Sequence, residues 1–151
     1  MLRFIAGFLF FAVSVFTIGE YAVAAETAGI AAQPGAGRRH KVVIQVSDND
    51  PAKWNLALNN ASNVQSDLGA RNVDVEIVAY GPGIGMIKLE SPLGEQVREA
   101  ISSGVRIVAC ENTMTNMKFT KDDMLNSLVY AKAGVVELMI RQQQGYAYIR
   151  P

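Results

Sequence analysis

The fold is decided by residues 41–46, Lys41-Val-Val-Ile-Gln-Val46, and by the pair Asp50-Pro51 that follows them. A short, nearly continuous β-branched run is typical of a strand that helices cover on both faces. Asp50 supplies a helix N-cap and Pro51 a first-turn proline. Apolar residues then recur at helical spacing, at Trp54, Ala57, Leu58, Ala61, Val64 and Leu68. We therefore expect a buried strand followed by a long amphipathic helix that ends at Gly69.

Strands and helices alternate in the same way further along the chain. Residues 73–79 and 105–109 are apolar runs that predict two more strands. Residues 80–85, Tyr80-Gly-Pro-Gly-Ile-Gly85, predict a loop at the end of the second strand. Ser91-Pro92 repeats the Asp50-Pro51 device and predicts a helix, with Gly104 beyond its end.

After the third strand, the pattern becomes shorter and more polar. We expect a short helical stretch around residues 113–118. Thr120 to Asp123 looks like a capping box, which predicts another short helix ending near Leu128. Residues 129–131 predict a brief fourth strand.

The chain closes with one more helix and one more strand. Residues 134–144 predict a helix whose inward side chains are Val135, Leu138 and Met139, and residues 146–149 predict the last strand. Strands that alternate with helices at this spacing imply an α/β fold. We expect a three-layer α/β/α sandwich around a mostly parallel sheet of about five strands.

Residues 1–25 have the pattern of a cleavable signal peptide. Arg3 precedes an apolar run, residues 4–18, which is too short to span a bilayer comfortably. Small residues follow in Ala22-Val-Ala-Ala25, which places cleavage near Ala24 or Ala25. The alternative is an uncleaved N-terminal helix, and no cysteine stands at the cleavage point to carry a lipid. We expect a periplasmic or secreted protein with no membrane attachment after cleavage.

The rest of the chain divides into a leader and one domain. Residues 26–39 are rich in Ala, Gly, Gln and Pro without an apolar period, which predicts a disordered leader. Residues 40–151 suit a single domain. The whole chain has 14 basic and 14 acidic residues, so it lacks the basic excess that nucleic-acid binding demands. The cluster Arg38-Arg-His-Lys41 is interpreted as a solvated approach to the first strand.

Candidate functional residues follow the predicted strands. In an open parallel sheet, ligands bind beyond the carboxyl ends of the strands. The loops at that edge bring together Asn49, Asp50, Tyr80, Gly81, Gly83, Gly85, Cys110, Glu111, Asn112 and Thr113. His40 lies at the opposite end of the first strand, so this edge has no catalytic histidine. No Cys and His spacing supports a metal site, and we expect neither a metal nor a cofactor.

Cys110 is the single cysteine and the candidate nucleophile. A thiol at a strand end, just before a helix, meets the partial positive charge of the helix N-terminus, which favours the thiolate. Glu111 would oppose this effect if its carboxylate faced the sulfur. The alternative is a buried cysteine that only packs as a small apolar residue. Position alone leaves both interpretations open.

The glycine loop has the spacing G-x-G-x-G and follows the second strand, so it is not the dinucleotide-binding fingerprint. We interpret it as a tight turn that lets the backbone approach a small anion or a neighbouring subunit. Trp54, Met86, Met114 and Met117 are interpreted as core or interface residues.

Four motifs together resemble a known family. They are Val46-Ser-Asp-Asn-Asp-Pro51 with Trp54 and Asn55, Val78-Ala-Tyr-Gly-Pro-Gly83, Val108-Ala-Cys-Glu-Asn-Thr-Met114, and the ending Gly145-Tyr-Ala-Tyr-Ile-Arg-Pro151. Residues 41–151 resemble the DsrE/DsrF-like proteins of bacterial sulfur metabolism, in an exported and largely uncharacterised branch. The resemblance implies an α/β/α domain that forms homo-oligomers, trimers or hexamers. It also implies that Cys110 carries sulfur as a persulfide. Better-characterised members are cytoplasmic, so their partners are not available to an exported chain.

The favoured hypothesis is an exported sulfur carrier or sulfurtransferase in which the Cys110 thiolate takes up sulfane sulfur. Asn112 and Thr113 with Asn49, Tyr80 and the glycines Gly81 and Gly83 would bind the anionic group. A single cysteine cannot resolve its own disulfide, so a small sulfur compound or a thiol-bearing partner protein must take part. One rival hypothesis is a non-catalytic homo-oligomeric module that binds a small ligand. Another is a redox sensor that forms a mixed disulfide.

Overall fold

The structure is a computed structural model that describes residues 39–151. The predicted signal peptide and, apart from Arg39, the predicted leader lie outside these residues and stay predictions. Within residues 39–151, no helix is long and apolar enough to cross a membrane.

Five parallel strands form the central sheet. The strands are β1 (His40–Val46), β2 (Val73–Ala79), β3 (Arg106–Cys110), β4 (Val129–Ala131) and β5 (Ala147–Ile149). Their order is β4-β3-β2-β1-β5, and each neighbouring pair is parallel, as the sequence predicts. The register pairs the last residues of β1 and β2, and Cys110 pairs with Ala131 at the end of β4. The carboxyl ends of these strands therefore share one edge.

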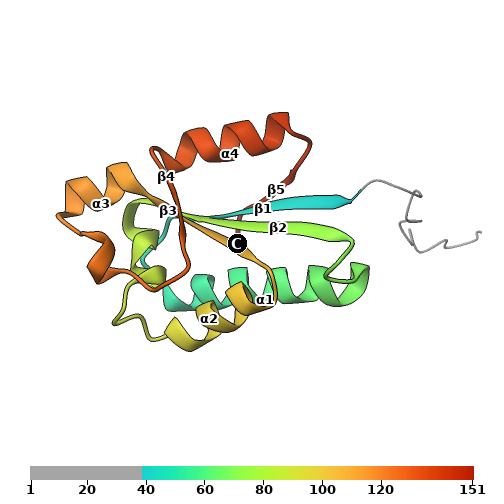
Figure 1. Ribbon diagram of the computed structural model, residues 1–151, viewed down its shortest axis with the longest axis horizontal. Coiled ribbons are helices and arrows are strands. Elements are labelled where there is room, and N and C mark those ends of the chain that lie inside the picture. The colour runs from blue at the N-terminus through green and yellow to red at the C-terminus, as the bar shows by residue number, and fades with distance from the viewer. Residues whose placement is uncertain (1–38) are drawn as a thin grey trace, which may run out of the picture. The chain divides into compact units, whose positions relative to one another are not determined.

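Helices cover both faces of the sheet and form the predicted three-layer α/β/α sandwich (Figure 1). Helices α1 (Pro51–Leu68) and α2 (Gly94–Ser102) lie on one face, and α4 (Gly134–Gln143) lies on the other. Helix α3 (Glu111–Met117) continues directly from the end of β3. Two short 3-10 helices, η1 (Gly81–Ile87) and η2 (Lys121–Asp123), complete the connections.

The predicted caps of α1 are present. Asp50 Oδ1 accepts a hydrogen bond from the Ala52 N–H at 2.9 Å, and Pro51 is the first helical residue. Gly69 ends the helix at φ 83°, a conformation that favours glycine. The sequence signals at both ends of this helix are therefore confirmed.

The core has two parts, one on each face of the sheet. The larger part fills the space between the sheet and helices α1 and α2, and includes Ile44, Ile77 and Ile107. The smaller part lies under α4 and consists of Val43, Val78, Val108 and Leu138. Because only four buried apolar residues make up this part, α4 is held by fewer apolar contacts than α1.

Several predicted elements differ from the structure. Residues 81–87 form the 3-10 helix η1 and not a loop. Helix α2 begins at Gly94 because Ser91-Pro92 form a turn, in which the Gly94 N–H bonds to the Ser91 carbonyl at 3.0 Å. The capping box at Thr120 is present, but it caps only the three residues of η2. Helix α3 begins at residue 111, earlier than predicted, because Cys110 is its N-cap.

The predicted orientation of α4 is wrong in part. Leu138 is buried as predicted, but Val135 and Met139 are 61% and 51% exposed. Arg141, which lies one turn after Leu138, faces the sheet and bonds to Glu76 in β2 at 3.0 Å. The helix therefore turns Arg141 toward β2 and turns Val135 and Met139 outward. The pattern of apolar residues does not reveal this long-range ion pair.

Candidate functional site

Cys110 lies at the carboxyl edge of the sheet, between the starts of two helices. It is the last residue of β3 and the N-cap of α3, and only 4% of it is exposed. Its Sγ accepts a hydrogen bond at 3.2 Å from the N–H of Gly134, the first residue of α4. The partial positive charges of both helix N-termini therefore meet at this sulfur and favour its anionic form.

The pKa of Cys110 reflects two opposing effects. Burial raises the pKa, whereas donors around the sulfur lower it: the Thr113 hydroxyl and the N–H groups of Gly134, Thr113 and Asn112. The donors prevail, and the pKa lies below the usual value of a thiol. The Asn112 N–H also bonds to the Lys132 carbonyl at 3.1 Å, which leaves it the weakest of these donors. Among residues 39–151, Glu111 contributes none of the largest effects on this pKa.

Thr113 links the glycine loop to the sulfur. Its side chain is buried, and its Oγ1 accepts a hydrogen bond from the Gly81 N–H at 2.9 Å. Because Gly81 supplies a donor to this oxygen, the hydroxyl proton is available for the Cys110 sulfur. Gly81 has φ 52°, a backbone conformation that favours glycine. The glycine loop thus acts on the thiol through Thr113.

Gly134 packs closely against two site residues. A Cβ added to it would lie 2.9 Å from Tyr80 Cβ and 3.3 Å from Cys110 Cβ. Only a residue without a side chain lets the start of α4 come this near to the sulfur. Gly134 begins a helix in the sequence pattern but is not a predicted site residue, because it follows Cys110 by 24 residues.

Tyr80, which packs beside Gly134, lies near the polar residues Ser47, Asp48 and Arg150. Burial raises the pKa of the Tyr80 hydroxyl, which also bonds to the Ser47 side chain. Arg150, which follows β5, lies 3.7 Å from the Asp48 carboxylate, and its side chain is half exposed. Ser47, Asp48 and Arg150 were not among the predicted site residues, although Ser47 and Asp48 lie in a loop that the strand pattern places at this edge.

The structure does not bring every predicted residue to the thiol. Asn112 and Thr113 donate to the Cys110 sulfur, Gly81 bonds to Thr113, and Tyr80 packs beside Gly134 next to Cys110. Gly83 has a backbone role, because a Cβ there would lie 2.4 Å from the Val46 carbonyl oxygen. Asn49 lines a separate hollow of about 370 Å³ on the α1 side, together with Trp54, Met117 and Phe119.

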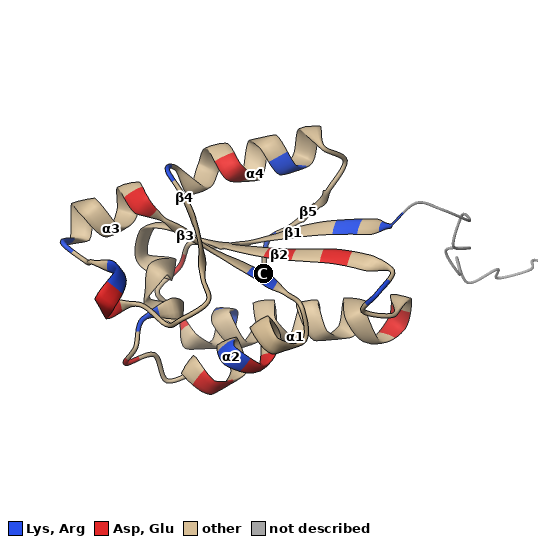
Figure 2. Cartoon of the chain, in the orientation of Figure 1, with Lys and Arg blue, Asp and Glu red and all other residues tan. Residues whose placement is uncertain are grey.

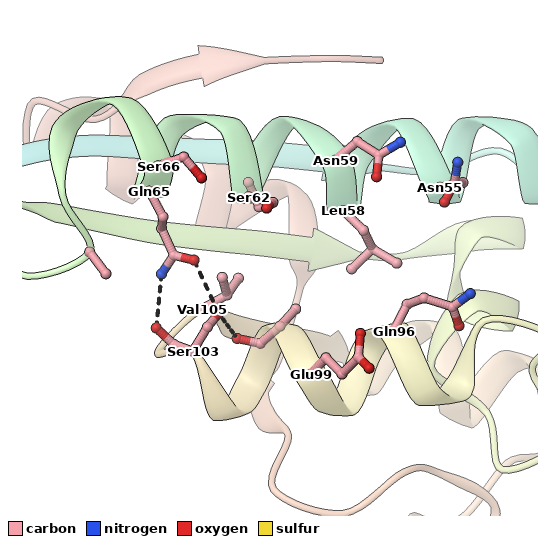
Figure 3. A pocket seen from close by; sticks show the side chains of 13 residues that line it. Asn55, Leu58, Asn59, Ser62, Gln65, Ser66, Gln96, Glu99, Ser103 and Val105 are labelled. Carbon is pink, nitrogen blue, oxygen red and sulfur yellow. Dashed lines mark hydrogen bonds between the residues drawn. The ribbon is translucent and has the colours of Figure 1, made fainter.

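Another hollow lies away from the thiol. It has a volume of about 480 Å³ and lies between α1 and α2, on the face of the sheet opposite α4 (Figure 3). Gln65 and Ser103 join the two helices across it with hydrogen bonds of 3.0 Å. Cys110 does not line this hollow, so we do not place the thiol chemistry there. Within residues 39–151, no group of three or more His, Cys, Asp or Glu side chains is arranged to hold a metal ion.

The sequence matches the model of the DsrE/DsrF-like family over residues 40–151. The chain belongs to the DsrE/DsrF-like family. No curated protein matches the sequence. Among solved structures, the chain is similar to the protein of unknown function MTH1491 from Methanobacterium thermoautotrophicum. The two share 33% sequence identity with a TM-score of 0.71, over 74% of this chain and 99% of the other.

A second solved structure shares the fold alone. It is the conserved protein of unknown function BT1422 from Bacteroides thetaiotaomicron, which is 14% identical with a TM-score of 0.55, over 74% of this chain and 94% of the other. Membership of the DsrE/DsrF-like family, with the α/β/α fold described above, indicates a role related to sulfur metabolism.

Proposed function

We propose that Cys110 carries sulfane sulfur as a persulfide, and that the protein works as an exported sulfur carrier or sulfurtransferase. One observation supports this most directly: several hydrogen-bond donors converge on a single buried sulfur and lower its pKa. The thiolate is the nucleophilic form of cysteine. A persulfide extends this anion by one sulfur atom, and the donors at the starts of α3 and α4 are placed to stabilise it.

The transfer needs no oxidant and no cofactor. The Cys110 thiolate attacks the outer sulfur of thiosulfate, the sulfur–sulfur bond of thiosulfate breaks, and sulfite leaves with the bonding electron pair. Cys110 then holds the anion Cys–S–S⁻. An acceptor thiolate attacks the outer sulfur in its turn, which forms a persulfide on the acceptor and restores the Cys110 thiolate. A persulfide donor reacts in the same way and leaves as a thiolate.

Transfer is tested by the release of sulfite from thiosulfate in the presence of an acceptor thiol. The native protein should release sulfite through repeated cycles, and Cys110→Ser should release none. The rival non-catalytic module predicts no release from either protein, and a modest change in stability for Cys110→Ser. A redox sensor predicts that Cys110 forms a mixed disulfide with glutathione disulfide but takes up no sulfur from thiosulfate.

The proposal includes a homo-oligomer with α4 in the interface. The outer face of α4 exposes four large apolar side chains: Val135, Val136, Met139 and Ile140. The helix carries only two charged residues, Glu137 and Arg141, and both are mostly buried (Figure 2). Exposed apolar surface of this kind is typical of protein–protein contacts. A subunit packed here would cover the helix whose first residue contacts the Cys110 sulfur.

Export is proposed from residues 1–25 and is tested on the chain as the cell produces it. Cell fractionation should find the protein in the periplasm or the medium. N-terminal sequencing should begin at Ala25 or Glu26, one residue after each expected cleavage position. A cytoplasmic protein that retains Met1 would contradict export and leave the thiol chemistry open to the transfer test above.

A further inference from the structure

Few buried residues hold α4 against the sheet. Gly134 and Leu138 are its only buried residues, and its outer side chains make no contribution to the core. One turn beyond Leu138, Arg141 faces the sheet with a side chain that is 16% exposed. The position of the helix therefore depends on its polar contact with β2 as well as on Leu138.

That contact is made with Glu76, a carboxylate in β2 that is 1% exposed. Arg141 Nε donates to Glu76 Oε1 at 3.0 Å, and Arg106 Nε lies 3.0 Å from Glu76 Oε2. Only the bond from Arg141 has good hydrogen-bond geometry, since Oε2 has no aligned donor among the described residues. Glu137 pairs with Arg141 at 2.9 Å, and the Arg141 guanidinium also lies over the Tyr146 ring.

A buried carboxylate between two arginines is not explained by stability alone. Taking charges out of water costs several kcal/mol per ion, so apolar residues of similar volume often give an equally stable core. A hydrogen-bonded ion pair does, however, fix direction and distance more narrowly than apolar packing, and the planar Arg141 guanidinium is held at three atoms: Nε by Glu76, Nη2 by Glu137 and Nη1 by Gln144. This favours a role for Glu76 in orienting α4.

We propose that Glu76 is a positioning residue for Cys110: its ion pair with Arg141 fixes α4 so that the Gly134 N–H reaches the sulfur. Arg141 follows Gly134 by about two turns of a rigid helix, so a shift at one position moves the other. The Gly134 nitrogen lies 3.2 Å from Sγ, and a displacement of the helix start changes the length and the angle of this bond and weakens it. The inference rests on the proposed function: by holding the Gly134 N–H at the sulfur, the ion pair between Glu76 and Arg141 keeps Cys110 in the nucleophilic thiolate form that sulfur transfer requires.

The test measures the thiolate directly. Cys110 is the only cysteine, so the pH dependence of alkylation by iodoacetamide reports this thiol without interference. Glu76→Leu and Arg141→Met each break the ion pair, and each should raise the midpoint of the profile by roughly 0.5–1 pH unit. Arg106→Met removes the other arginine beside Glu76 but leaves the bond between Glu76 and Arg141 in place, and it should leave the midpoint in place.

The sign of the shift separates positioning from a direct effect of charge. Direct electrostatics predicts a lower midpoint for Glu76→Leu, which removes a negative charge, and a higher one for Arg141→Met, which removes a positive charge. Positioning predicts a rise in both. An unchanged or lower midpoint in Glu76→Leu, or an equal rise in Arg106→Met, overturns the proposal. If Glu76→Leu does not fold, Arg141→Met against Arg106→Met decides the question alone.

Alkylation uses no sulfur donor, so the two proposals fail separately. A shifted midpoint in a protein that takes up no sulfur would keep Glu76 as a positioning residue and remove the sulfur-carrier function. Sulfur uptake with an unshifted midpoint would keep the sulfur-carrier function and remove Glu76 as a positioning residue.

Discussion

Replacing Gly134 with alanine should push the start of α4 away from the Cys110 sulfur. The added Cβ would lie 2.9 Å from Tyr80 Cβ, 3.2 Å from Tyr80 Cγ and 3.3 Å from Cys110 Cβ. Carbon atoms in contact prefer a separation of about 3.5–4.0 Å, so the helix or the Tyr80 ring must move by about half an ångström. That movement lengthens and weakens the hydrogen bond from the residue 134 N–H to Sγ.

Two opposing effects set the change in stability. Overpacking a close-packed site costs about 1–3 kcal/mol. Alanine in place of glycine contributes about 0.4–1 kcal/mol by restricting the unfolded chain. The free energy of unfolding should therefore fall by roughly 0.5–2 kcal/mol in Gly134→Ala. The pKa of Cys110 should rise, because the thiolate loses a hydrogen bond.

Urea unfolding gives the change in stability, and the pH profile of alkylation gives the pKa of the thiol. Gly94→Ala is the matched control, because Gly94 opens α2 as Gly134 opens α4, and its added Cβ meets atoms no closer than 3.7 Å. The control should leave the pKa in place and be neutral or slightly stabilising. An unchanged pKa together with unchanged or higher stability in Gly134→Ala would refute the reasoning.

Three further predictions follow from the site and from α4. Thr113→Val removes a donor to the sulfur, so it should raise the pKa of Cys110, which the pH profile of alkylation measures. It also leaves the Gly81 N–H without its acceptor, so the free energy of unfolding in urea should fall by about 1–3 kcal/mol. Met139→Lys should reduce the oligomer size measured by light scattering, whereas Leu89→Lys, an equally exposed site elsewhere, should not. Because the pKa of Cys110 is lowered, sulfur loading from thiosulfate should reach half its maximum at a lower pH in the folded protein than in the same protein unfolded in urea, and an equal or higher midpoint in the folded protein contradicts a stabilised thiolate.

Much of the fold was predictable because its signals are local. The Asp50-Pro51 pair and Gly69 mark the ends of α1, and the apolar runs at 73–79 and 129–131 match β2 and β4 at both ends. The orientation of α4 was not predictable in this way. Its sequence has apolar residues on most sides, and the buried face includes Arg141 because of a partner in β2.

The candidate site also combines residues that local sequence signals predict with residues that only long-range packing brings in. Cys110, Thr113 and Gly81 belong to loops that the strand pattern brings to one edge, so a shared site could be expected from sequence. Gly134 reaches the sulfur only because α4 packs on the sheet. The ion pair between α4 and the sheet joins Arg141 to Glu76, which lies in the middle of β2. A pattern of apolar residues carries no information about either contact.

The most direct test of sulfur carriage is intact-protein mass spectrometry of the purified protein after incubation with thiosulfate, polysulfide or glutathione persulfide. The expected result is a mass increase of one sulfur atom, reversed by a reductant and absent in Cys110→Ser. No adduct with any of the three donors, together with slow alkylation of Cys110 in the folded protein, would contradict a persulfide carrier and favour a binding module with a structural cysteine.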